Sequence, residues 1–98
     1  MKIRWTEPAV LDLESIKNYI SRDSEYYAYE FIARMFEAIE KLDADPKTGK
    51  KVRELRDRSI RELIFQGYRV VYRFSEEEIL ILAILNIAAN SRKMKRHP

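Results

Sequence analysis

The chain has 98 residues, which suffice for one domain with a single hydrophobic core and exclude a multidomain protein. It contains no cysteine and one histidine, so a disulfide framework and a thiolate zinc site are excluded and a histidine metal centre is disfavoured. The sequence has no secretory leader and no apolar run of about 18 residues, so we expect a cytoplasmic protein without metal, small-molecule cofactor or membrane contact.

The formal net charge is +3, and it is distributed unevenly along the chain. Residues 1–50 hold 8 Lys/Arg against 10 Asp/Glu, a net charge of −2, whereas residues 51–98 hold 11 against 6, a net charge of +5. The basic character therefore belongs to the second half of the chain. It indicates an anionic partner, either nucleic acid or an acidic protein segment, although such an asymmetry also serves solubility alone.

The first 45 residues predict a short strand followed by two helices. Lys2–Trp5 is the strand candidate, and Thr6 is placed to cap a helix that has Pro8 in its first turn. Ser24 is placed to cap a second helix, which Asp45-Pro46 ends. Apolar residues recur at helical spacing in both segments: Ala9, Leu13, Ile16 and Ile20, then Ala28, Ile32, Met35, Ile39 and Leu42. We expect an antiparallel helix hairpin with one apolar face.

Residues 60–74 alternate with period two and predict a β-hairpin. If Gln66-Gly67 is a two-residue turn with Gly67 at positive φ, then Phe65 pairs with Tyr68 and Arg61 with Tyr72. One face then collects residues that suit a core: Leu63, Phe65, Tyr68, Val70, Tyr72 and Phe74. The other face collects Glu62, Arg69 and Arg73 between Ile60, Ile64 and Val71. This second face is too charged to be buried, and it suits phosphate binding, acid/base chemistry or an acidic partner.

Residues 79–87, ILILAILNI, are almost continuously apolar, which predicts a central strand covered on both faces. The expected fold class is α+β, with an N-terminal strand and the helix hairpin packed on a mainly antiparallel β-sheet. We expect one domain over residues 1–98, in which residues 91–98 form a flexible basic tail with Arg92, Lys93 and Lys95 as candidate nucleic-acid contacts. Tyr26, Tyr27 and Tyr29 are expected at the edge of the core rather than stacked on bases.

Several separated blocks of this sequence resemble the RelE/ParE superfamily of toxins from type II toxin-antitoxin modules, which includes plasmid stabilisation proteins. The resemblance covers Ile3 to about Asn90. It depends on the order and spacing of these blocks: WTEPAVLDLESIKNYI, DPKTGKKVREL, IRELIFQGYRVVYRF and ILILAIL. The resemblance implies the fold of these toxins and neutralisation by a cognate antitoxin protein.

Members of the superfamily share one fold but have at least two different biochemical activities. RelE-like members cut messenger RNA on the ribosome without a metal, using basic side chains, and in some members a carboxylate or histidine, to activate the ribose 2′-OH and stabilise the phosphate. ParE-like members lack that catalytic set and poison DNA gyrase. By this resemblance the protein is an enzyme only if it is RelE-like.

The resemblance assigns candidate roles to a few residues of the hairpin. In the nuclease case Arg69 and Arg73 would hold the scissile phosphate, with Arg61 or Arg92 assisting and Glu62 as a candidate base. We favour a structural role for Glu62, as the partner of Arg69 or Arg73 across the strands. The face formed by Arg61, Arg69 and Arg73 would equally bind a nucleic acid or a protein partner.

The residues that end the last strand distinguish the two activities. Many nuclease members end this strand with histidine and arginine, whereas this chain reads Asn86-Ile87-Ala88-Ala89-Asn90. The sequence therefore favours a gyrase inhibitor, with a ribosome-dependent endoribonuclease as the alternative. A non-toxic binding module of the same fold is the second alternative.

Overall fold

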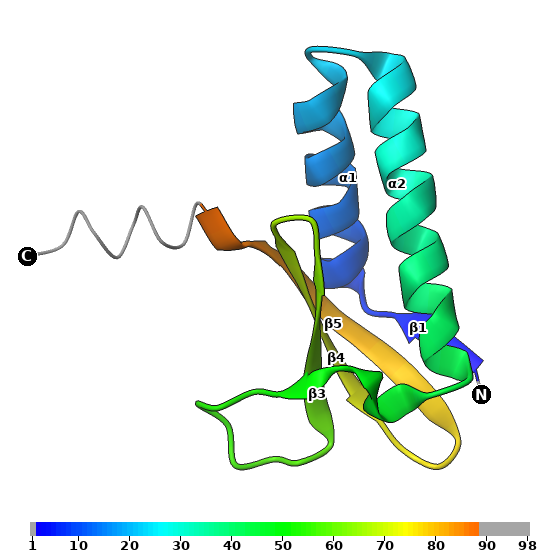
Figure 1. Cartoon of the computed structure of the whole chain (residues 1–98), viewed down its shortest axis with the longest axis vertical. Helices are drawn as coiled ribbons and strands as arrows, with labels where there is room; N and C mark the ends of the chain where they lie inside the picture. The colour runs from blue at the N-terminus through cyan, green and yellow to red at the C-terminus, as the bar shows by residue number, and fades with distance from the viewer. Residues whose placement is uncertain (1, 89–98) are drawn as a thin grey trace, which may run out of the picture.

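The computed structural model describes residues 2–88 of the chain. Their elements follow in the order β1 (Lys2–Trp5), α1 (Glu7–Ser21), α2 (Glu25–Glu40), two 3₁₀ turns (Lys41–Asp43 and Pro46–Thr48), β2 (Lys50–Lys51), β3 (Ile60–Phe65), β4 (Tyr68–Phe74) and β5 (Glu78–Asn86). Figure 1 shows α1 and α2 standing side by side, with β5 and β4 crossing beneath them. The fold is α+β, as predicted.

The five strands form one sheet in the order β1-β5-β4-β3-β2. β1 runs parallel to β5, and the other neighbours are antiparallel. The mainly antiparallel sheet expected from the sequence is therefore confirmed. β5 is an interior strand, flanked by the first strand of the chain on one side and by the β3–β4 hairpin on the other, and β4 lies in the middle of the sheet.

Both predicted helix caps are present. The Oγ1 atom of Thr6 accepts a hydrogen bond from the amide of Ala9 at 3.3 Å, and the Oγ atom of Ser24 accepts one from Tyr27 at 3.1 Å. Thr6 also donates to the carbonyl of Ile81 at 2.8 Å, so the cap ties the start of α1 to β5. α2 ends at Glu40, earlier than predicted, because the chain tightens into a 3₁₀ turn before Asp45-Pro46.

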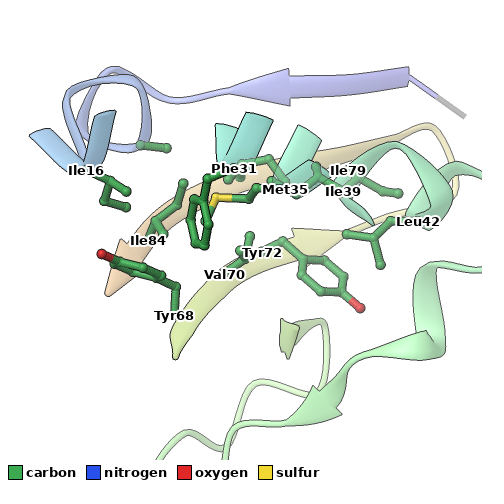
Figure 2. Close-up of a cluster of buried hydrophobic side chains, with 12 residues drawn as sticks. Ile16, Phe31, Met35, Ile39, Leu42, Tyr68, Val70, Tyr72, Ile79 and Ile84 are labelled. Carbon is green, nitrogen blue, oxygen red and sulfur yellow. The ribbon is translucent and has the colours of Figure 1, made fainter. Parts of the chain in front are cut away.

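The hydrophobic core lies between the two helices and one face of the sheet (Figure 2). It confirms the predicted helix stripe and the predicted core face of the hairpin. Its buried members are Ala9, Ile16, Phe31, Met35, Ile39, Leu42, Tyr68, Val70, Tyr72, Ile79, Ile81 and Ile84. Trp5 extends the core toward β1 by stacking on Phe36, with ring centroids 5.2 Å apart.

Two of the three tyrosines at the start of α2, Tyr26 and Tyr29, do not lie at the core edge, and for these two the prediction was wrong. Tyr26, Tyr27 and Tyr29 are 73%, 55% and 72% exposed. The buried stripe of α2 begins at Ala28 and continues through Phe31, so Tyr26 and Tyr29 project from other sides of the helix. Of the three, Tyr27 approaches the core, with its ring centroid 6.2 Å from that of Phe31.

The prediction that β5 is covered on both faces was also wrong. Ile79, Ile81 and Ile84 are buried under the helices, while Leu80 and Leu85 on the opposite face are only partly buried. A register shift explains why Ile81 and Ile84 point the same way although they are three residues apart: Val71 pairs with Ala83, but Tyr72 pairs with Ile81. Leu82 is thus an extra residue, and the bulge exchanges the faces of the strand beyond it.

Candidate functional site: the open face of the sheet

The site is the face of the sheet that the helices leave uncovered, which we call the open face. Strand register places the following residues on it: Lys2 and Arg4 on β1, Glu78, Leu80, Ala83 and Leu85 on β5, Arg69, Val71 and Arg73 on β4, Ile60, Glu62 and Ile64 on β3, and Lys50 on β2. Its charged residues surround a partly buried apolar centre formed by Val71, Leu80, Ala83 and Leu85.

The β3–β4 turn sets the position of the arginines. Gln66 and Gly67 both have positive φ, +41° and +88°, which is the geometry of a type I′ turn. Phe65 therefore pairs with Tyr68, and every pairing predicted from Phe65 back to Arg61 is confirmed. The sequence had assigned positive φ to Gly67 alone. With this register, Arg69 lies beside Ile64 and diagonally across from Glu62.

Glu62 and Arg69 form the most buried ion pair of the open face. The distance from Arg69 Nη1 to Glu62 Oε2 is 3.2 Å, and the two side chains are 32% and 17% exposed. The pairing that we favoured for Glu62 is thus present, with Arg69 as the partner. The Oε2 atom is buried and has no hydrogen bond of good geometry, so the pair is close but imperfectly aligned.

The other two arginines of the open face are also paired within the chain. Arg73 Nη2 lies 3.6 Å from Asp57 Oδ2, and Arg4 Nη1 lies 3.2 Å from Glu78 Oε2. Asp57 is held by Ser59, whose hydroxyl donates to its Oδ1 atom at 2.6 Å and whose amide donates to the same atom at 2.9 Å. These two hydrogen bonds lower the pKa of Asp57, and the charge of Arg73 adds a smaller contribution in the same direction.

Arg61 does not join Arg69 and Arg73. It pairs with Tyr72 and so lies on the face that carries the core, where its Nη1 atom donates to the carbonyl of Gly49 at 3.1 Å. Its guanidinium lies 5.7 Å from the ring centroid of Phe74. The geometry gives Arg61 a structural role, anchoring the segment that leads into β2.

The same segment is anchored by Tyr72. Its buried hydroxyl donates to the carbonyl of Pro46 at 2.6 Å and accepts from the amide of Gly49 at 3.0 Å. Burial raises the pKa of Tyr72, with the hydrogen bond from Gly49 opposing that effect. Pro46 and Gly49, two positions that carry the resemblance, are thus parts of the scaffold rather than of the open face.

The remaining predicted site residues, Arg92, Lys93 and Lys95, lie outside the described residues, and their role stays a prediction. Within residues 2–88, no three acidic or histidine side chains come close enough to hold a metal ion. No helix in the same range is long and apolar enough to cross a membrane.

Sequence reasoning missed one polar feature beside the core. A hollow of about 200 Å³ lies between α1 and the ends of β4 and β5, lined by Asp12, Ser15, Ile16, Tyr19, Tyr68, Ile84 and Asn86. At its wall, Asp12 Oδ2 accepts a hydrogen bond from the amide of Ile84 at 2.9 Å, two residues beyond the bulge. This contact could have been predicted once the strand order was known. β1 ends opposite Ile81, so the β5 amides that follow on that edge have no partner in β1 and need another acceptor.

Two solved structures with the same fold come from bacterial toxin-antitoxin systems. The chain superposes on a chain of the chromosomal ParDE toxin-antitoxin system of P. aeruginosa with a TM-score of 0.73 and 23% identity, covering 89% of this chain and 96% of the other. It also superposes on a chain of the toxin-antitoxin complex RelBE2 of Mycobacterium tuberculosis with a TM-score of 0.62 and 24% identity, covering 87% and 95%. Comparison with curated proteins gave no significant match.

Two helices on a five-stranded mixed sheet are the fold that this chain shares with these two toxin-antitoxin structures. Residues 3–90 match the sequence model of the ParE toxin of type II toxin-antitoxin system, parDE. The chain belongs to this ParE toxin family.

Proposed function

We propose that this toxin inhibits growth through a ParE-like action on DNA gyrase, with the open face as its working surface. The proposal concerns the target. The comparisons support the coarser statement, that the chain is the toxin of a type II toxin-antitoxin module.

The observation that carries the proposal is the poor supply of acid/base groups on the open face. Metal-independent cleavage of RNA needs a side chain that takes a proton from the ribose 2′-OH and another that protonates the leaving oxygen. On β5, the one ionisable side chain is that of Glu78 at the start of the strand, and it is paired with Arg4. On β3, the carboxylate of Glu62 is engaged by Arg69. These features suit a surface that binds a protein better than one that cuts RNA.

A cognate antitoxin is the second partner that we propose. The two solved relatives come from a toxin-antitoxin system and a toxin-antitoxin complex, which supports such a partner for this chain. Both proposed partners and the ribosome are intracellular, so the proposal places the toxin in the cytoplasm.

Induced expression in a bacterial host, with two parallel assays, tests the target. Growth should stop, purified toxin should block supercoiling by gyrase, and primer extension should find messenger RNAs intact. Cuts in messenger RNA at ribosome-bound codons would overturn the proposal in favour of the endoribonuclease. Normal growth without antitoxin would favour the non-toxic binding module.

Two matched substitutions test the surface. Arg73→Ala removes an ion-paired arginine from the open face, and Arg34→Ala removes an exposed one from α2, where it lies 3.5 Å from Glu30. We expect Arg73→Ala to reduce gyrase inhibition about tenfold, in the range typical of an interface arginine, and Arg34→Ala to change it little. Equal effects of the two substitutions would remove the open face from the proposal.

A further inference from the structure

The arginines of the open face do not present free positive charge. Arg4, Arg69 and Arg73 each lie within 3.2 to 3.6 Å of a carboxylate of the same chain, namely Glu78, Glu62 and Asp57. These three pairs surround the apolar centre, since Arg69 lies opposite Leu85 and Arg73 opposite Leu80. A partner that binds arginine through its own anions must therefore compete with carboxylates that are already in place.

The pair of Arg69 and Glu62 is the one best placed for such competition. Glu62 is the least exposed carboxylate of the three, yet its buried Oε2 atom lacks a hydrogen bond of good geometry. Removing a carboxylate oxygen from water costs free energy, and an oxygen without well-aligned hydrogen bonds recovers only part of that cost. Glu62 is thus held near Arg69 without the full stabilisation that a well-aligned pair would gain.

A second cation lies next to Glu62. Lys50 on β2 is the direct cross-strand partner of Glu62, and its side chain is exposed. Side chains of directly paired residues lie on the same face, close enough for an ion pair. Glu62 can therefore move from Arg69 to Lys50 by side-chain rotation, without leaving the sheet and without becoming an unpaired charge.

We propose that Glu62 is an internal competitor for Arg69, and that a carboxylate from an acidic and apolar protein segment replaces it when the open face is bound. In the complex, the partner's Asp or Glu pairs with Arg69, Glu62 turns to Lys50, and apolar side chains of the segment cover Val71, Leu80 and Leu85. This inference rests on the open face being the working surface of the proposed function. It adds the chemistry of the partner and a contact that regulates its binding.

A protein segment fits this surface better than a nucleic acid does. Phosphate binding gains its strength from lysines and arginines that are free to replace counterions. Here each arginine already has a carboxylate beside it, which leaves Lys2 and Lys50 near the two edges of the sheet for that role. A phosphate chain across the open face would approach Glu62, Glu78 and Asp57 as well. The apolar centre instead suits a protein interface, which has an apolar core, arginines among its strongest contacts and a polar rim.

The experiment measures binding of two fluorescein-labelled probes to the full chain by fluorescence anisotropy. The protein probe is an eight-residue peptide that alternates leucine and glutamate, and the nucleic-acid probe is an eight-residue oligothymidylate. Glu62→Gln should tighten peptide binding about fivefold, because it removes the competitor and keeps the shape of the side chain. Glu78→Gln removes the same charge from the same face but leaves Arg69 and Glu62 intact, and it should change binding less than about twofold.

A double-mutant cycle assigns the effect to Arg69. In an Arg69→Ala background, Glu62→Gln should no longer tighten peptide binding, because the guanidinium for which Glu62 and the peptide compete is absent. Thermal melting of each variant shows whether it is folded at the temperature of the assay.

The inference would be overturned by equal effects of Glu62→Gln and Glu78→Gln, by a Glu62→Gln effect that persists without Arg69, or by the absence of peptide binding in both the wild type and Glu62→Gln. A larger gain for oligothymidylate than for the peptide would make a nucleic acid the occupant and would also overturn it. The gyrase assay is separate. If gyrase is unaffected while Glu62 and Arg69 are coupled in peptide binding, the proposed function fails and the inference stands.

Discussion

The hydroxyl of Tyr72 accepts a hydrogen bond from the amide of Gly49, 23 residues earlier in the chain, at 3.0 Å. The same hydroxyl donates to the carbonyl of Pro46, and Arg61 donates to the carbonyl of Gly49. Three backbone groups of one loop are thus bound by two side chains of the β3–β4 hairpin. This loop leads into β2, which places Lys50 beside Glu62, so the scaffold and the open face are linked at this point.

We expect Tyr72→Phe to destabilise the fold by about 1–3 kcal/mol, because it removes the hydrogen-bond partner of two backbone groups at a buried position. The midpoint of urea denaturation measures the effect. Tyr29→Phe is the matched control, since Tyr29 is exposed and should lose almost nothing. If the two variants unfold at the same urea concentration, the loop is not anchored by Tyr72.

Gly49→Ala should be destabilising for steric reasons. A Cβ atom at Gly49 would lie 2.5 Å from the Tyr72 hydroxyl and 2.7 Å from the carbonyl oxygen of Glu62, and we expect a loss of about 1–3 kcal/mol. Gly67→Ala has open space around it and should lose about 1–2 kcal/mol from its positive φ alone. Combining Tyr72→Phe with each alanine variant separates the causes in thermal melts. The losses should be less than additive with Gly49→Ala and additive with Gly67→Ala.

Asp12 should stabilise the bulge in β5. Its carboxylate accepts the hydrogen bond of the Ile84 amide at 2.9 Å, so Asp12→Ala leaves that amide without its partner, and we expect a loss of about 1–3 kcal/mol. Asp12→Asn keeps a side-chain oxygen and should recover most of the loss. Hydrogen exchange gives the local measurement: exchange of the Ile84 amide should accelerate in Asp12→Ala. Glu14→Ala, on the exposed side of α1, is the control, and a similar acceleration there would refute the assignment.

Asp57 should give the protein a stability that depends on pH. The folded state lowers its pKa below 3.8, so ionised Asp57 favours the folded state. This contribution is fully present above pH 3.8 and is lost as the pH falls through the lower, folded-state pKa. Thermal melts of wild type and Asp57→Asn from pH 7 to pH 2 should therefore converge at the acid end. A constant difference between the two curves over the whole range would contradict this role.

The hairpin could be predicted from the sequence because local rules determine it. The turn residues and the period-two alternation both placed Phe65 opposite Tyr68, and the structure has that register. The position of Arg61 was also implied, since its pairing with Tyr72 puts it on the core face. Grouping it with Arg69 and Arg73 followed charge and ignored alternation.

Other features could not be read from the sequence. ILILAIL is apolar at every position, so no change of period marks Leu82 as the extra residue of a bulge. The three tyrosines of α2 were placed at the core edge by their spacing along an amphipathic helix, while the helix turns Tyr26 and Tyr29 toward solvent. The pairing of Arg73 with Asp57 depends on a loop without regular pattern, and loop geometry is not encoded in periodicity.

The parallel pairing of β1 with β5 has a consequence for when the open face forms during synthesis of the chain. Lys2 pairs with Glu78, so the sheet is completed only after 76 further residues have been synthesised. Contacts of such high sequence separation form late and slowly during folding. Until β5 emerges, α1 lacks the strand that covers its apolar side and Arg73 has no Leu80 beside it. A nascent chain therefore has no open face until β5 has been synthesised, and the surface that we propose for partner binding forms only then.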